Sequence, residues 1–186
     1  MSDITIDIFS KKSIDKAIKE LEKRRESLQI ICENLIDELA NIGIKTASSC
    51  VRESELANAI TVKISDFTST EMGCKAVIIA SGKVYTSEKY DPFYTVLAVE
   101  FGAGISYNRG NENPNASEFG YGVGTFPGQV HAFEEGWYYF GEDNKWHYTK
   151  GIKATMPMYN AQMEILQSMS DIGKKVIGET KLWQVG

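Results

Sequence analysis

Histidine and cysteine are scarce in this sequence, and their scarcity limits the chemistry that it can support. Among 186 residues there are two histidines and three cysteines. His131 and His147 have neither the H-E-x-x-H spacing nor the adjacent cysteine pair that a zinc site requires. Cys32, Cys50 and Cys74 form no C-x-x-C pair, and an odd number cannot close a set of disulfides. We therefore expect reduced, buried thiols and no metal site.

A recognisable catalytic motif is also missing. A Cys–His hydrolase needs a reactive thiol beside a base, but Cys32 and Cys74 lie within apolar patterns, and nothing around Cys50 resembles a nucleophile motif. The glycines of residues 120–124 lack the Lys-Ser/Thr that follows a phosphate-binding loop. We predict that the protein is not an enzyme and that it has no cofactor.

Long apolar runs and clusters of basic residues are absent as well. No uncharged stretch approaches the length of a membrane span, and the N-terminus has no signal-peptide pattern, so we expect an intracellular chain without a membrane partner. The net charge is -5, which argues against sequence-specific binding of nucleic acid. The apolar fraction of 42% and the length fit one globular domain, residues 1–186.

The first long pattern has the period of a helix. After an N-terminal arm, 1–12, apolar residues at three- and four-residue spacing predict an amphipathic helix over 13–42, capped by Gly43. At about 1.5 Å per residue such a helix spans roughly 45 Å, so part of it should project or pack on a partner. Arg24 and Arg25 interrupt its apolar stripe, and they indicate either solvated surface or a contact with a neighbouring subunit.

The middle of the chain reads as strands. Residues 46–57 are ambiguous between a short helix and a loop, whereas 59–67 and 74–80 predict an antiparallel hairpin. Residues 94–101 are apolar on both faces and predict a further strand that carries Glu100 near its end. Together, 59–101 forms the expected sheet core.

A glycine-rich segment, 102–136, follows that strand. It holds eight glycines and loses apolar periodicity, which is typical of a binding loop or of a segment ordered by a partner. Its aromatic residues set it apart from a solvating linker. The candidate interface residues are Tyr107, Phe119, Tyr121 and Phe126.

Aromatic arms in 137–149 predict a second hairpin, and a helix over 156–177 follows with Thr155 as N-cap and Pro157 in its first turn. A short tail, 178–186, ends the chain. The predicted fold class is therefore α+β: a long N-terminal helix and a C-terminal helix packed on a small antiparallel sheet, with a long glycine-rich loop.

Two short motifs resemble one family. VEFGAGI at 99–105, followed by GWYYF and by TKGIKATMPMYNA at 149–161, resembles the minor tail component or tail-completion family of bacteriophage and prophage head–tail joining proteins. Ala103 stands where that family usually has Thr, and Met158 where it has an aromatic residue. The motif residues are Glu100, Phe101, Gly102, Gly104, Gly151, Lys153 and Pro157.

The resemblance implies a structural virion protein of the neck, without catalytic residues. Such a protein would form a homo-oligomeric ring of six subunits between the connector and the tail-tube proteins, and it would reside in the host bacterial cytoplasm during assembly. The alternative is a soluble ligand-binding or hydrolytic domain that uses the aromatic glycine-rich loop.

One structural hypothesis concerns Glu100. A carboxylate beside Val and Ala at the end of an apolar strand should be partly buried and paired, and Lys150 or Lys153 of the second motif is the expected partner. The competing interpretation is an edge-strand acid in water.

Overall fold

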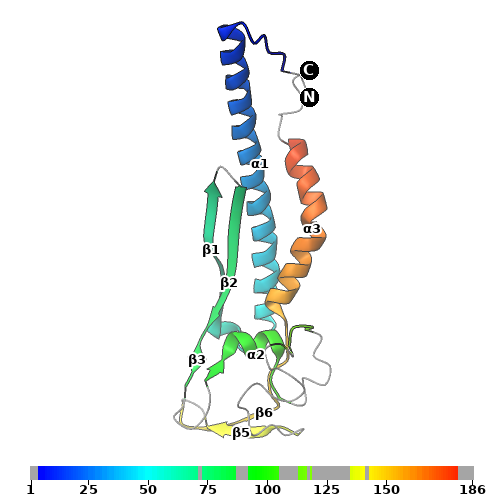
Figure 1. The fold of residues 1–186 in the computed structure, drawn as a ribbon. Helices are drawn as coiled ribbons and strands as arrows, with labels where there is room; N and C mark the ends of the chain where they lie inside the picture. The colour runs from blue at the N-terminus through cyan, green and yellow to red at the C-terminus, as the bar shows by residue number, and fades with distance from the viewer. Residues whose placement is uncertain are drawn as a thin grey trace. The chain divides into compact units, whose positions relative to one another are not determined.

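The computed structural model confirms an α+β fold built from helices and small antiparallel sheets (Figure 1). It describes residues 4–70, 73–86, 92–104, 113–116, 118, 135–140 and 143–179. The elements in chain order are α1 (Lys11–Arg52), the 3-10 helix η1 (Ala57–Ala59), β1 (Ile60–Thr70), β2 (Gly73–Gly82), β3 (Val84–Tyr85), β4 (Phe93–Tyr94), α2 (Thr95–Phe101), β5 (Trp137–Phe140), β6 (Trp146–Thr149) and α3 (Pro157–Glu179).

The chain groups into two compact units, and each is discontinuous in sequence. Unit 1 comprises residues 1–41, 64–77 and 165–186, and unit 2 comprises 42–63 and 78–164. Both motifs singled out in the sequence fall in unit 2. The expectation of one domain remains a prediction.

The N-terminus of α1 is fixed by local hydrogen bonds. The helix begins at Lys11, two residues earlier than predicted, with Ser10 as its N-cap. The Ser13 amide donates to the Ser10 side-chain oxygen (3.4 Å), and the Asp7 amide donates to the Ser13 hydroxyl (2.9 Å). The first contact satisfies an amide that a helix start otherwise leaves unpaired, and the second ties the N-terminal arm to the first turn of α1.

The predicted end of α1 at Gly43 is wrong, because the helix continues to Arg52. A glycine inside a helix costs about 1 kcal/mol relative to alanine. Burial of Ala47 and Val51 on the following turns offsets that cost. The ambiguous stretch 46–57 is thus helical as far as Arg52, and η1 begins at its end.

The first predicted hairpin is confirmed and is longer than expected, with β1 paired to β2. In unit 1 it carries a small polar network with α1. The Gln29 amide donates to the Ser69 hydroxyl (3.0 Å), which donates to Glu33 (2.5 Å). Farther along α1, Glu38 forms an ion pair with Lys175 of α3 (2.9 Å). Residues 71–72 at the tip lie outside the described residues.

The third predicted strand, 94–101, is wrong: Thr95 to Phe101 form the helix α2. A short apolar run does not distinguish a buried strand from a buried helix. The helical form pairs its backbone internally and places Thr95, Ala98 and Val99 on a common buried side. Thr95 anchors the start of α2, since its hydroxyl donates to the Lys83 carbonyl (2.8 Å).

The core of unit 2 brings α1, β1 and α2 together. Val51, Ile60 and Val99 form a buried cluster, against which Val96 and Ile152 pack. These side chains come from α1, β1, α2 and the segment before α3, so the cluster fixes α2 against the end of α1 and the start of β1. Figure 1 shows α2 next to the first turn of α3.

The second predicted hairpin is confirmed as β5 and β6. Its antiparallel register pairs Trp137 with Thr149, Tyr138 with Tyr148, Tyr139 with His147, and Phe140 with Trp146. The predicted C-terminal helix, 156–177, is observed as α3, from Pro157 to Glu179. Most of the glycine-rich segment 102–136 and residues 180–186 of the tail lie outside the described residues.

Candidate functional site

The two sequence motifs meet in unit 2, at a junction between the end of α2 and the start of α3. A pair of backbone hydrogen bonds joins them: the Ala103 amide donates to Ile152 (2.8 Å), and the Ile152 amide donates to Ala103 (2.7 Å). The Val99 carbonyl accepts from the amides of Thr155 (2.9 Å) and Met156 (3.3 Å). Backbone pairing therefore holds the segment before α3 against the end of α2.

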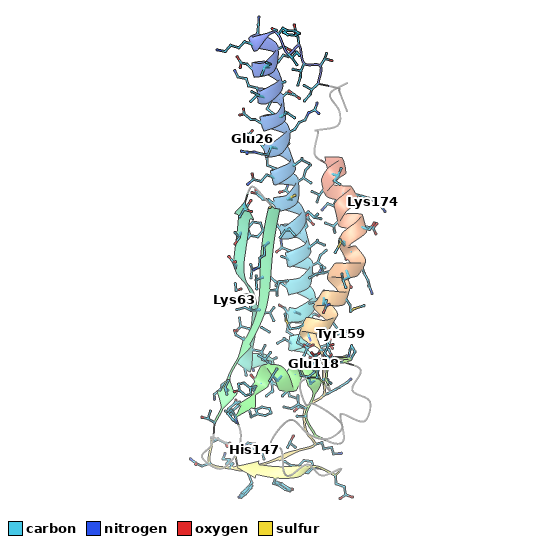
Figure 2. All side chains as sticks on the ribbon, viewed as in Figure 1. Glu26, Lys63, Glu118, His147, Tyr159 and Lys174 are labelled. Atoms are coloured by element: carbon cyan, nitrogen blue, oxygen red, sulfur yellow. The ribbon has the colours of Figure 1, made fainter. Side chains whose placement is uncertain are left out.

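Glu100 is the centre of this junction, and its side chain is 7% exposed. One carboxylate oxygen, Oε2, accepts the amide of Met158 (2.8 Å), and the other, Oε1, accepts the amide of Tyr159 (3.0 Å). The side-chain amide of Asn113 donates to Oε1 (2.9 Å). Figure 2 places Tyr159 in the first turn of α3. Glu100 is thus an N-terminal cap that is contributed by another helix.

With this cap, each backbone amide in the first turn of α3 has a hydrogen-bond acceptor. Pro157 is the first helical residue and has no amide hydrogen. Met158 and Tyr159 donate to Glu100, and Asn160 donates to the Met156 carbonyl (2.9 Å). A carboxylate at this end also complements the positive end of the helix dipole. The predicted place of Pro157 in the first turn is confirmed.

The predicted pairing of Glu100 with Lys150 or Lys153 is wrong. Both lysines are exposed, and the carboxylate accepts backbone amides and Asn113 instead. Helix amides directed at a buried carboxylate satisfy it without the desolvation of a second charge. The competing interpretation of Glu100 as a solvated edge-strand acid is also wrong.

The predicted N-cap, Thr155, does not cap α3. Residue Met156 precedes the helix, and it adopts a positive φ of 50°, a conformation that costs a non-glycine residue on the order of 1 kcal/mol. The Thr155 hydroxyl is buried without a hydrogen-bond partner among the described residues. The Glu100 cap takes over the role that was assigned to Thr155.

The glycines of the motifs allow the two segments to approach. Gly102, Gly104 and Gly151 have φ values of 77°, 93° and 104°. A Cβ atom on Gly151 would overlap the carbonyl oxygen of Ala103. Only glycine meets both the conformational and the spatial requirement at that position. Phe101 is buried and packs against Ala116.

The exposed face of the β5–β6 hairpin is aromatic. Tyr138, Trp146 and Tyr148 are 67%, 68% and 51% exposed. Tyr138 lies opposite Tyr148, with ring centroids 5.3 Å apart, and residues two apart on a strand share a face, so all three side chains lie on one side. We call these three residues the aromatic face.

At the tip of the same hairpin, His147 and Asp143 form a hydrogen-bonded pair. The ring nitrogen Nε2 lies 2.8 Å from Oδ1 of Asp143, and Figure 2 labels His147 on this hairpin. The hydrogen bond from His147 lowers the pKa of Asp143 below its ordinary value of 3.8. His131 lies outside the described residues.

The other predicted interface residues have separate places. Arg24 forms an ion pair with Glu20 one turn earlier (3.6 Å), and Arg25 is exposed on the same stretch of α1. Both arginines belong to unit 1, whereas the junction residues belong to unit 2. Tyr107, Phe119, Tyr121 and Phe126 lie outside the described residues, as does most of the loop on which the ligand-binding alternative depends.

The described residues contain no group of three or more His, Cys, Asp or Glu side chains that could hold a metal ion. An open groove of about 460 Å³ in unit 2 is lined by Ile42, Lys45, Thr46, Ser49, Cys50 and Glu164. The Cys50 sulfur accepts a hydrogen bond from the Asn160 amide (3.5 Å). The three cysteines are free and half-buried, whereas the sequence predicted buried thiols.

Sequence reasoning missed two features of the junction. Asn113 lies in a polar, asparagine-rich stretch, where nothing distinguishes it from its neighbours. The capping role of Glu100 was hidden because the run before it was read as a strand. A signal was nevertheless present: Pro157 marks the first helical residue, and Met156, directly before it, is not a residue type that caps helices.

The fold and the junction define a small α+β protein whose motif residues hold its own elements together and whose aromatic face is exposed. Comparisons with protein-family models, with curated proteins and with solved structures gave no match. Among the described helices, none is both long and apolar enough to cross a bilayer.

Proposed function

We propose that this chain is a structural assembly protein of a tailed phage or prophage, a tail-completion component that forms a ring of six copies between the connector and the tail tube. The VEFGAGI and TKGIKATMPMYNA motifs suggest the family. The proposal places the protein in the virion and, during assembly, in the cytoplasm of the host.

The observation that carries the proposal is that the motif residues of unit 2 have structural roles. Glu100, the acid of the first motif, is committed to capping α3, and the glycines around it serve close backbone packing. A buried carboxylate with three donors is a structural group rather than a reactive one. The motif therefore builds a rigid support rather than a catalytic centre.

The aromatic face supplies the second part of the argument. Tyr138, Trp146 and Tyr148 are large, have few rotatable bonds, and combine an apolar ring with a polar group. Such residues are enriched where proteins contact one another. Their exposure on a short two-stranded sheet supports a role in docking to a neighbouring virion protein.

Assembly can be tested directly with purified components. The chain is mixed with the connector and tail-tube proteins of its genome, and the products are examined by electron microscopy and light scattering. We expect rings or stacked complexes. A double variant, Tyr138→Ser with Trp146→Ser, should assemble poorly, because it removes two aromatic anchors.

Tyr94→Ser is the control, since Tyr94 is an exposed aromatic residue on β4, outside the aromatic face. It should assemble like the unmodified chain. Mixtures that yield neither rings nor complexes would refute the proposal.

A further inference from the structure

The N-terminal part of α1, in unit 1, carries a row of lysines along one of its sides. Lys12, Lys16, Lys19 and Lys23 recur at intervals of four, three and four residues, and all four are exposed. Since an α-helix turns by about 100° per residue, this spacing keeps the four side chains within an arc of about 60°. At a rise of about 1.5 Å per residue, the row is about 16 Å long. We call these four residues the lysine stripe.

The charge of the lysine stripe has no counter-charge among the described residues. None of its four ammonium groups forms a hydrogen bond or an ion pair with another described residue. Glu20, one turn after Lys16, forms its ion pair with Arg24 instead (3.6 Å). Like charges three and four residues apart on a helix repel one another. An anion that binds along the stripe would relieve this repulsion.

The lysine stripe is separate from the covered side of this part of α1. Ala17 is 5% exposed, so neighbouring atoms cover the helix at that point. Ala17 lies about 100° or more around the helix from each of the four lysines. The cover over Ala17 therefore leaves the lysine stripe exposed.

The composition of the stripe distinguishes between kinds of anionic partner. No apolar side chain lies among the four lysines, whereas a protein interface has an apolar centre and is depleted in lysine. A bilayer takes up the apolar side of a helix, and Ile14 and Leu21 lie on the side opposite the lysines, so a bilayer that bound them would leave the lysines farthest from the headgroups. The phosphates of nucleic acid, in contrast, are bound by Lys and Arg charges without apolar contact.

Double-stranded DNA has the charge density that suits a straight row of cations. It carries one negative charge per about 1.7 Å of helix axis, so a row about 16 Å long can face about ten phosphates. A lysine is a flexible point charge, which binds phosphate without reading bases. The segment Lys11–Leu28 contains seven basic and four acidic residues, a net charge of +3, although the whole chain has a net charge of -5.

We infer that the lysine stripe contacts the phosphate backbone of double-stranded DNA without regard to base sequence. Each of the four ammonium groups binds a phosphate and displaces a condensed counterion. The inference goes beyond the proposed function, which requires no contact with DNA. It agrees with the acidic net charge, which argues against sequence-specific binding only.

The test uses the full chain and a fluorescein-labelled duplex of about 20 base pairs. Binding is followed by fluorescence anisotropy between about 50 and 200 mM sodium chloride, and we expect a micromolar Kd at the lower concentration. Four phosphate contacts predict a slope of about -3.6 for the logarithm of the affinity against that of the salt concentration. The affinity should therefore fall about 100-fold over this range. A duplex of unrelated sequence should bind equally well.

Two matched substitutions test the position of the contact. Lys19→Gln and Lys11→Gln remove the same charge from the same helix, but Lys11 is an exposed residue outside the stripe, about 100° from Lys12. We expect Lys19→Gln to weaken binding about tenfold at the lower salt and to reduce the slope by about 0.9, because one phosphate contact is lost. Lys11→Gln should weaken binding less than about threefold, since an exposed charge away from the contact is screened. Circular dichroism checks that each variant is folded.

Several results would overturn the inference: the duplex fails to bind at the lower salt; the two substitutions weaken binding equally; or single-stranded DNA or a polyglutamate peptide of similar length binds as tightly as the duplex. Rings that form from a chain that does not bind DNA would refute the contact and leave the proposed function intact. DNA binding by a chain that forms no rings with the connector and tail-tube proteins would do the reverse.

Discussion

At the scale of single residues, Glu100 is the motif residue whose side chain joins two helices. Its two oxygens take the only two amides that the first three residues of α3 can offer, because Pro157 has none. Hydrogen bonds to a charged group contribute about 1.5–3 kcal/mol each, and an amide left without an acceptor in a buried place costs about 1–3 kcal/mol. The hydrogen bonds of Glu100 therefore hold α2 to the start of α3.

Glu100→Gln should lower the free energy of unfolding by about 2 kcal/mol, because a neutral amide keeps the shape, offers one acceptor oxygen instead of two, and loses the interaction with the helix dipole. Urea unfolding followed by circular dichroism measures the change. Glu55→Gln, at an exposed position, is the control and should change stability by less than about 0.5 kcal/mol. Equal effects of the two substitutions would contradict the capping role.

Gly151→Ala should destabilise the junction by more than about 2 kcal/mol, because the residue has a positive φ and the new methyl group would overlap the Ala103 carbonyl. Gly173→Ala is the matched control: Gly173 lies within α3 with nothing near its missing Cβ. That change should stabilise the protein by about 0.5–1 kcal/mol through helix propensity. Thermal unfolding of both variants checks the two signs, and a neutral Gly151→Ala would show that the close approach is not needed.

At the scale of elements, the β5–β6 hairpin combines the aromatic face with a hydrogen-bonded Asp143–His147 pair at its tip. Asp143 is exposed and His147 is half-buried, and the pair joins the turn to the start of β6. The pKa of Asp143 is lowered, first by the hydrogen bond from His147. The pair therefore links the order of the hairpin tip to pH.

A carboxyl whose pKa is lower in the folded hairpin favours the folded form above its ordinary pKa, and this contribution disappears as pH falls through the folded value. Carbon-13 NMR of the Asp143 carboxyl should thus show a midpoint below 3.8 in the unmodified chain. In His147→Ala the midpoint should rise toward 3.8, since the main cause of the shift is removed. A midpoint that stays unchanged in this variant would assign the shift to another group.

Elements also differed in how far the sequence predicted them. The β1–β2 and β5–β6 hairpins, α3 and most of α1 follow from alternation, helical periodicity and a first-turn proline. The segment 95–101 did not, because its apolar residues suit either a strand or a helix. Contacts with residues distant in sequence stabilise the helix rather than a strand. They join Thr95 to Lys83, Val99 to Val51 and Ile60, and Glu100 to α3.

At the scale of the whole molecule, the aromatic face in unit 2 is the exposed surface to which the proposed function assigns a contact with partners. The junction that holds α2 to α3 is buried and internally satisfied. In the proposed function, the junction is the rigid support and the aromatic face is the contact surface.

Hydrogen–deuterium exchange before and after assembly with connector and tail-tube proteins should report this separation. We expect new protection in residues 137–149, because in the proposed assembly a partner covers the aromatic face. Amides of 157–161 should change little, since Glu100 already protects the first turn of α3. Uniform protection, or protection confined to the junction, would contradict the assignment of the aromatic face as a contact surface.

The sequence alone determined the α+β class, both hairpins and the positions of the two long helices, because periodicity, glycine and proline act through local backbone preferences. It also identified Glu100, Gly151 and Pro157 as residues to examine. Only the tertiary structure decided that 95–101 is a helix and that Glu100 caps α3 rather than pairing with a lysine. The physical reason is that a buried carboxylate takes whichever donors the fold brings to it, and here the amides of a helix start reach it from about sixty residues along the chain.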